Sequence, residues 1–447
     1  MKHLVAFILY ITCLSSLSFS QSVYLKNATI IDGTGNAPLK NANLFIKDGW
    51  IQSVGKDHTK VAADVQVIDA SGKTIIPLLL NTHGHLGTLK GTTTIAENYT
   101  RENILRQLKK YESYGVGAVL SMGTDRPLMF EGLRDSSRKR LLPGAMIFSA
   151  GYGFGVPNGA PPMQMGMDRV FRPATAAEVP AMIKQLADLK VDVVKMWVDD
   201  FGGSFIKMKP EIYTAIIKEA HQHGLRVASH LYYLEDARKL VQLGVDIIAH
   251  SIRDQEIDDA LIAEMKKHKV TYIPTLSLDE YAYIYASQPS WINDPFFKAS
   301  LEPGVYEMIT SKDYQDKLKN SPAFAKNMKA FETTLKNVKK IADAGIFISL
   351  GTDSGATPVR AQGFSEHLEL ELLVKAGLTP LQAITIATGN ASKVLHINNE
   401  YGTLEKDKRA DFMLLKEDPL TDIKYTRSID AVWKNGIKVS SGPLAGE

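Results

Sequence analysis

The sequence is almost without cysteine: it has one such residue among 447, at position 13. A single thiol can supply neither the disulfide framework of a small secreted domain nor a cysteine-based zinc site. Stability therefore has to come from a buried apolar core, and any metal ligands have to be His, Asp, Glu or Lys side chains. The hydrophobic content of 45% and charged content of 23% are ordinary for a globular enzyme.

An excess of charge of one sign is also lacking. The 52 Lys and Arg residues nearly balance the 49 Asp and Glu residues, for a net charge of +3, and the basic residues form no cluster. Proteins that bind nucleic acid usually carry a basic patch. We therefore expect a small-molecule substrate as the partner and no nucleic acid.

One apolar stretch stands apart at the N-terminus. Lys2 gives a short basic start, residues 4–14 are mostly apolar, and Ser18 and Ser20 stand where a signal peptidase needs small residues. This pattern predicts a signal peptide of residues 1–20, whose removal would also remove Cys13. The alternative is a membrane anchor, but the stretch is shorter than the roughly 20 residues of a spanning helix. We expect a periplasmic or secreted protein with no stable membrane insertion after cleavage.

Short apolar runs alternate with amphipathic stretches through most of the chain. This alternation is typical of βα units and a parallel sheet, and eight such strands predict an α/β fold with a (β/α)8 TIM-like barrel. The expected strands are 75–83, 118–122, 145–149, 193–198, 226–230, 246–250, 271–276 and 346–352. The expected helices include 101–114, 176–189, 210–223, 234–243, 258–268 and 333–344.

The two ends of the chain follow a different pattern, with short strands separated by turns such as Asp48-Gly49 and Asn435-Gly436. We expect residues 21–73 and 402–447 to form one small β-sandwich domain beside a barrel of residues 74–401.

Two long segments follow predicted strands. Residues 151–167 are rich in Gly, Pro and Met, and residues 278–325 contain many aromatic residues. Long loops at this face of a barrel are usually lids or substrate walls, and the aromatic residues favour a substrate with an apolar or ring-bearing part. Surface decoration or a dimer contact is the alternative.

Chemically useful side chains stand at the ends of several predicted strands. His83 and His85 flank Gly84, and alternate residues of a strand point to the same side. The other candidates at the same mouth are Lys195, His230, His250 and Asp353. A lone strand histidine is more often a core residue than a ligand, and Asp353 alone could begin a turn. The ordered set, with ligand types that suit zinc, makes coincidence a poor explanation.

Lys195 is the least ordinary member of the set. A lysine in the middle of a buried strand is costly unless its charge is removed or paired. Burial lowers the pKa of an amine, and a neutral amine can react with carbon dioxide to form a carbamate. The anionic carbamate has two oxygens and could bridge two metal ions.

Taken together, the chain resembles the amidohydrolase superfamily, in the branch of imidazolonepropionase-like proteins and Xaa-Pro dipeptidases (prolidases). The resemblance covers essentially the whole mature chain. It includes residues 67–73, which lead into the His pair, the segment Gly377-Leu378-Thr379-Pro380 and the later Ala410-Asp411-Phe412. It departs where the family usually has Gly and Asp, at Leu78 and Asn81. Neither residue is a ligand, so we expect altered packing there.

The resemblance implies two divalent metal ions, most simply zinc. It places one ion on His83, His85 and Asp353, the other on His230 and His250, and carbamylated Lys195 between them. Barrels of this family often pair, so a homo-oligomer is a further expectation.

The implied reaction is hydrolysis of an amide or peptide C–N bond, for example of a dipeptide, an Xaa-Pro dipeptide or an N-acyl amino acid. A hydroxide that bridges the metals would attack the carbonyl, and Asp353 would carry the proton to the leaving nitrogen. Candidates for substrate contacts are Tyr232, Tyr233, Arg253 and His367. Arg253 could instead pair with the nearby Asp254 or Glu256.

Several other functions remain open at this point. A lactonase or phosphotriesterase would use the same metal centre on a C–O or P–O bond. A mononuclear deaminase of the superfamily would carry Glu where Tyr233 stands and would not need Lys195. A non-catalytic barrel would usually have lost several ligands, whereas this chain retains the whole set.

Overall fold

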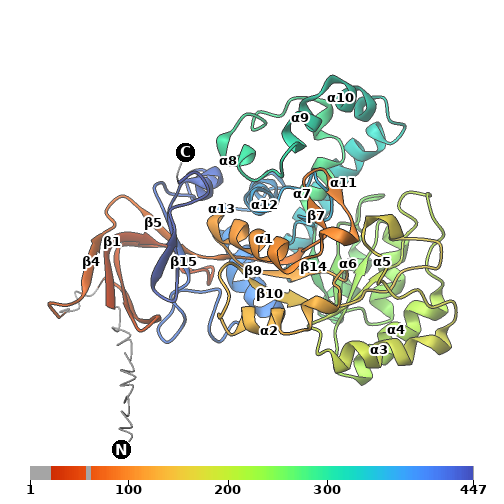
Figure 1. Ribbon diagram of the computed structural model, residues 1–447, viewed down its shortest axis with the longest axis horizontal. Coiled ribbons are helices and arrows are strands. Elements are labelled where there is room, and N and C mark those ends of the chain that lie inside the picture. Colours follow the sequence, from red (N-terminus) through yellow and green to blue (C-terminus); the bar gives the residue numbers. More distant parts are fainter. Residues whose placement is uncertain (1–21, 57–61, 446–447) are drawn as a thin grey trace, which may run out of the picture.

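The computed structural model describes residues 22–56 and 62–445 (Figure 1). The expected signal peptide, with Cys13, lies outside the described residues. Within them, none of the helices combines the length and the apolar character needed to cross a membrane.

The two ends of the chain meet in one eight-stranded sheet. Its order is β17-β16-β15-β5-β1-β2-β3, with β4 paired to β1. The strands are β1 (Ser22–Ile30), β2 (Leu39–Lys47), β3 (Trp50–Gly55), β4 (Gln66–Asp69), β5 (Thr74–Pro77), β15 (Phe412–Leu415), β16 (Ile429–Lys434) and β17 (Ile437–Ser440).

Pairing of β5 with β15 joins the early strands to the late ones. The two strands are antiparallel, with Ile75 opposite Leu414, and their buried side chains share a core with Val23. The rings of Phe412 and Trp433 stack in that core at 5.6 Å. Residues 74–77, which the sequence assigned to the barrel, belong to this sheet. The two-layer sandwich stays a prediction.

Two parallel sheets form the centre of the molecule. One has the order β10-β9-β6 and the other β11-β12-β13-β14. Their strands are β6 (Leu79–Gly84), β9 (Val116–Ser121), β10 (Met146–Ser149), β11 (Val194–Trp197), β12 (Val227–His230), β13 (Ile247–Ala249) and β14 (Thr271–Ile273). A two-stranded ribbon of β7 (Leu89–Lys90) and β8 (Thr93–Thr94) follows β6.

Helices connect and cover these strands (Figure 1). Capping residues fix where some of them begin: the side chains of Thr100 and Asp258 accept hydrogen bonds at the first turns of α1 and α6. The helices are α1 (Arg101–Ser113), α2 (Leu133–Arg138), α3 (Val179–Asp188), α4 (Pro210–Gln222), α5 (Leu234–Gln242), α6 (Asp259–Lys267), α11 (Phe324–Asp343), α12 (Phe364–Lys375), α13 (Pro380–Thr385) and α14 (Ala391–Val394).

The segment expected as an eighth strand, residues 346–352, is extended but is not assigned as a strand. Single parallel bridges join Ile348 to Tyr272 on β14, and Ser354 to Gly84 on β6. The segment lies between the two sheets, and Thr82 N donates to Leu350 O at 2.9 Å. The assigned sheets therefore do not by themselves form a closed barrel.

The aromatic-rich segment contains four short helices, α7 (Leu276–Tyr281), α8 (Pro295–Lys298), α9 (Val305–Thr310) and α10 (Lys312–Lys319). Its aromatic residues are mostly core residues: Tyr281, Tyr285 and Phe297 are each at most 2% exposed. They build this subdomain, so they no longer argue for a ring-bearing substrate.

Candidate metal centre

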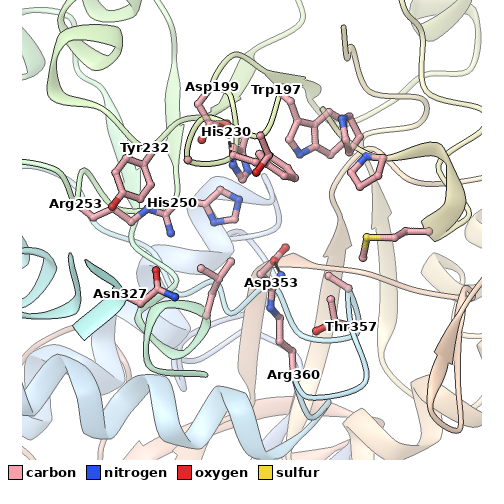
Figure 2. Close-up of a pocket in the computed structure, with 18 of the residues that line it drawn as sticks. Trp197, Asp199, His230, Tyr232, His250, Arg253, Asn327, Asp353, Thr357 and Arg360 are labelled. Carbon is pink, nitrogen blue, oxygen red and sulfur yellow. Dashed lines mark hydrogen bonds and ion pairs between the residues drawn. The ribbon is translucent and has the colours of Figure 1, made fainter. Parts of the chain in front are cut away.

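The strand ends bring the predicted ligands to one cavity of about 650 Å³ (Figure 2). Five of them line it: His83, His85, His230, His250 and Asp353. The strands are parallel, so their carboxyl ends meet at the same mouth. Lys195 lies on β11 and is 0% exposed.

His83, His85 and Asp353 form one compact group. Asp353 Oδ1 lies 2.8 Å from His85 Nε2 and 3.3 Å from His83 Nε2. The other nitrogen of His85, Nδ1, lies 2.8 Å from the hydroxyl of Thr124, which orients the ring. Gly351 is needed beside this group, because a Cβ there would lie only 2.7 Å from Cβ of His83.

His230 and His250 stand beside this group. The ring of His250 is 4.4 Å from that of His83 and 4.3 Å from that of His230, between centres. His250 has the unusual φ of +92°, and its Nδ1 lies 2.8 Å from the hydroxyl of Thr275. Strained backbone of this kind is common at functional sites.

Lys195 is buried in the way its sequence context predicts. Its Nζ makes no hydrogen bond within the described part of the chain and lies 5.4 Å from the ring centre of Trp197. Burial lowers the pKa of Lys195 to about 7, against the opposing effect of Asp353 and Asp199. A substantial neutral fraction of the amine follows near pH 7.

The residues present fit a divalent cation. Ligand atoms of His83, His250 and Asp353 all lie within 4.8 Å of one another. Neither ring nitrogen of His83 makes a hydrogen bond with any described residue, and Nδ1 of His230 is likewise buried without one. Burial, with the charge of Lys195 as a second cause, lowers the pKa of His83 to about 3. The imidazole is thus neutral, as a metal ligand must be.

Two charged residues of the site were missed in the sequence. Asp199 follows β11, is 1% exposed, and its Oδ1 lies 3.1 Å from Nε2 of His230. Arg360 donates a hydrogen bond to Oδ2 of Asp353. Although burial raises the pKa of Asp353, Arg360 and His85 hold it well below its usual range. The position of Asp199 at a strand end was a usable signal, whereas Arg360 lies on an irregular loop.

The four predicted substrate contacts have different surroundings. Tyr232 and Arg253 line the cavity. Arg253 donates to Asp279 and to Leu231 O, so its partner is neither Asp254 nor Glu256.

Tyr233 and His367 are absent from the described cavity lining. The hydroxyl of Tyr233 donates to Asp200 at 2.9 Å. His367 is 0% exposed, and its ring nitrogens lie 2.9 Å from the hydroxyl of Thr426 and from Tyr114 O. The prediction of His367 as a pocket residue is corrected accordingly: the residue is part of the core.

The two long segments contribute unequally to the walls. Residues 151–167 supply Pro161, Pro162, Met165 and Met167. Residues 278–325 supply only Leu278, Pro322 and Ala323 to the cavity lining within the described chain. The Met-rich segment is therefore the larger wall.

The Amidohydrolase family matches residues 74–439 of this sequence, which include all six predicted ligands. The chain belongs to the amidohydrolase family. Members of the family use divalent metals, and the His and Asp group described above is in keeping with this.

Imidazolonepropionases, which belong to the predicted branch, are among the relatives of this chain. Imidazolonepropionase of Brevibacillus brevis is 23% identical over 447 residues, which cover 91% of this chain and 92% of the relative. Ochratoxinase of Aspergillus niger is 28% identical over 255 residues, or 55% of this chain. The match spans only 44% of the length of that ochratoxinase.

Solved structures give the fold. A putative prolidase from Bifidobacterium longum superimposes with a TM-score of 0.75 at 24% identity, covering 95% of this chain and 96% of that one. A Xaa-Pro dipeptidase with methionine bound in its active site gives 0.72 at 22% identity, covering 94% and 99%. These likenesses establish an α/β fold of the TIM-like barrel type. The predicted family and branch are confirmed. Relatives such as imidazolonepropionase and prolidase are C–N bond hydrolases.

Proposed function

We propose that this protein is a binuclear, metal-dependent amidohydrolase that cleaves an amide or peptide bond of a small substrate. The observation that carries the proposal is the convergence of four histidines and Asp353 on one cavity, beside a buried lysine amine that has no hydrogen-bond partner among the described residues. Side-chain nitrogens of His83, His230 and Lys195 are buried without a hydrogen-bond partner among the described residues, and a structural core seldom leaves polar groups in that state.

The ligands divide naturally into two sets. His83, His85 and Asp353 would hold one ion, and His230 and His250 the other, with Lys195 as a carbamate between them. Nitrogen and oxygen ligands suit zinc. Thr124 and Thr275 would orient His85 and His250 through the ring nitrogens that do not face the ions.

When bound, the two ions would lower the pKa of water and polarise the substrate carbonyl. The side chains of the protein then transfer the proton and orient the reacting groups. Asp353 accepts the proton of the attacking water and passes it to the leaving nitrogen. Arg360 fixes the Asp353 carboxylate through Oδ2 and leaves Oδ1 toward the histidines. Tyr232 borders the space where the substrate lies.

Metal analysis of Lys195→Ala tests the centre. We expect the variant to bind fewer than two ions per chain and to lose nearly all activity, with partial recovery when short carboxylic acids replace the carbamate. Lys218→Ala, an exposed lysine of α4, is the matched control. Two ions and full activity in Lys195→Ala would refute the bridging carbamate.

The substrate class is tested with a panel of Xaa-Pro dipeptides, N-acyl amino acids and lactones. We expect turnover of amides. Turnover of lactones alone would replace the amide assignment with the lactonase alternative.

Three architectural expectations belong to the same proposal. The extended segment 346–352 would complete a closed barrel, the terminal sheet would fold as a sandwich, and the chain would form a homo-oligomer. A crystal structure tests the first two, and analytical ultracentrifugation tests the third.

We also propose export of the protein after cleavage at residue 20. N-terminal sequencing of the protein from fractionated cells tests this, and a protein that still begins at Met1 in the cytoplasm would contradict it.

A further inference from the structure

Two of the three cations that line the cavity are paired with carboxylates. Besides the histidines, the cavity is lined by two acids, Asp199 and Asp353, and by three cations, Arg253, Lys326 and Arg360. Arg360 is bound to Asp353, and Asp199 lies against His230. Arg253 is occupied by Asp279, outside the lining.

Lys326 is the exception. Across residues 22–56 and 62–445 no carboxylate pairs with it, although exposed lysines elsewhere on α11, such as Lys336 and Lys339, have acidic partners. Its positive charge at the cavity mouth is therefore unmatched by the protein itself.

The position of Lys326 is defined by two contacts. Its Nζ lies 5.1 Å from the ring centre of Tyr232, within the range of a cation–π interaction. A Cβ added at Gly202 would lie 3.4 Å from the same Nζ. The amine thus extends from α11 to the loop after β11, across the entrance to the metal centre.

One wall of the cavity is apolar. Met167 and Trp197 pack together, with Met165 and Phe201 against them, and all four line the cavity. Figure 2 shows Trp197 on one side of the pocket and Tyr232 and Asn327, the neighbour of Lys326, on the other. A substrate in the cavity would meet both a cation and an apolar surface.

We propose that Lys326 binds the carboxylate of the substrate, and that the site selects N-acyl amino acids or dipeptides whose apolar side chain lies against the Met and Trp wall. This inference rests on the proposed function, since it concerns the same cavity. An unmatched amine attracts an anion, whereas a neutral amide in the same place gains no ion pair.

Binding of a matched pair of compounds to the zinc-loaded full chain tests the inference. N-acetyl-L-phenylalanine has a carboxylate where N-acetyl-L-phenylalaninamide has a neutral amide, and the two are otherwise alike. By calorimetry at pH 7, we expect the wild-type protein to prefer the carboxylate by about tenfold. Lys326→Gln should reduce this preference to about twofold and leave the affinity for the amide unchanged, while Lys326→Arg should preserve it.

Lys329→Gln is the matched control, because Lys329 is an exposed lysine of the same helix outside the cavity lining. No preference in the wild-type protein, or a preference that survives in Lys326→Gln, overturns the inference. Hydrolysis measured in parallel separates the two proposals. If amides are cleaved but Lys326→Gln keeps the preference, only the carboxylate site is refuted. If no amide is cleaved but the preference depends on Lys326, only the proposed function is refuted.

Discussion

Asn81 donates a hydrogen bond of 2.6 Å from Nδ2 to Oε1 of Glu366. The same amide group also donates to the hydroxyl of Thr352 at 2.8 Å, while Oδ1 of Asn81 accepts from the backbone N–H of His83 at 2.9 Å. Glu366 accepts further bonds from the hydroxyls of Thr352 and Ser354, both at 2.8 Å. This buried network ties the strand that carries His83 to the segment that carries Asp353.

The network accounts for an amide rather than a carboxylate at position 81. An aspartate carboxylate at this position would face the Glu366 carboxyl where the amide of Asn81 now donates a hydrogen bond. We predict that Asn81→Asp lowers the free energy of unfolding by about 3 kcal/mol, as expected for an unpaired buried charge. Urea unfolding of the metal-free chain measures this.

The double variant Asn81→Asp, Glu366→Gln is the control for that prediction. It exchanges the amide and the carboxyl across the same contact, so it should recover more than half of the lost stability. A double variant no more stable than Asn81→Asp would show that the two residues are not coupled.

The hydroxyl of Thr275 gives a second prediction, because it holds Nδ1 of His250 at 2.8 Å and both residues are buried. In Thr275→Val the ring loses its orienting partner, and we expect zinc affinity to fall by about 10- to 100-fold. Competition with a chelator measures the change. Thr271→Val, at the start of strand β14, which precedes Thr275, should bind zinc like the wild type, and equal affinities in both variants would contradict the prediction.

The sequence predicted the ligand-bearing strands well, and there is a physical reason. A buried parallel strand must be apolar on both faces, so polar residues such as Lys195 or His230 stand out against it. The short apolar runs also predicted where the strands begin and end. The run predicted as a strand at 226–230, for example, is β12 (Val227–His230) in the structure. These parts of the site could be predicted from local pattern alone.

The features of the fold and site that the sequence did not predict depend on contacts between distant parts of the chain. The sequence around Leu78 does not show which residue packs against it. In the structure, a Cβ added at Gly117 would lie only 3.0 Å from Cβ of Leu78, so the bulky leucine is paired with a glycine. His367 follows the last ligand segment as a pocket residue would, yet helix α12 turns it toward η7 (Ile423–Arg427). Arg360 reaches Asp353 only because its loop folds back.

The altered assignment of His367 leads to a third prediction. His367→Ala removes both buried hydrogen bonds of the ring and leaves a cavity, which should cost about 2–4 kcal/mol of unfolding free energy. Because His367 is outside the pocket lining, KM for any substrate of the panel should stay within about twofold of the wild type. A large change in KM with unchanged stability would return His367 to the substrate site.

Glu369 gives a prediction about pH. Its carboxyl accepts hydrogen bonds from the backbone N–H groups of Leu276 and Ser277, at 2.7 and 2.8 Å, at the first turn of α7. Burial nevertheless raises the pKa of Glu369 from 4.5 to about 8. Between these two pH values the unfolded chain has lost a proton that the folded chain still holds. Rising pH therefore favours the unfolded state across this window, and the contribution of Glu369 to stability is lost by about pH 8.

Glu369→Gln removes this titration and keeps the shape of the side chain. The amide nitrogen of Gln cannot accept a hydrogen bond from a backbone N–H, so the variant is less stable, but this loss of stability does not vary with pH. We therefore expect the melting temperature of the variant, relative to the wild type, to rise between pH 5 and pH 8. Glu211→Gln, on an exposed position of α4, should show no such trend. If the wild type and Glu369→Gln change in parallel with pH, Glu369 is ionised in the folded chain at pH 5, and its two backbone hydrogen bonds outweigh the cost of burial.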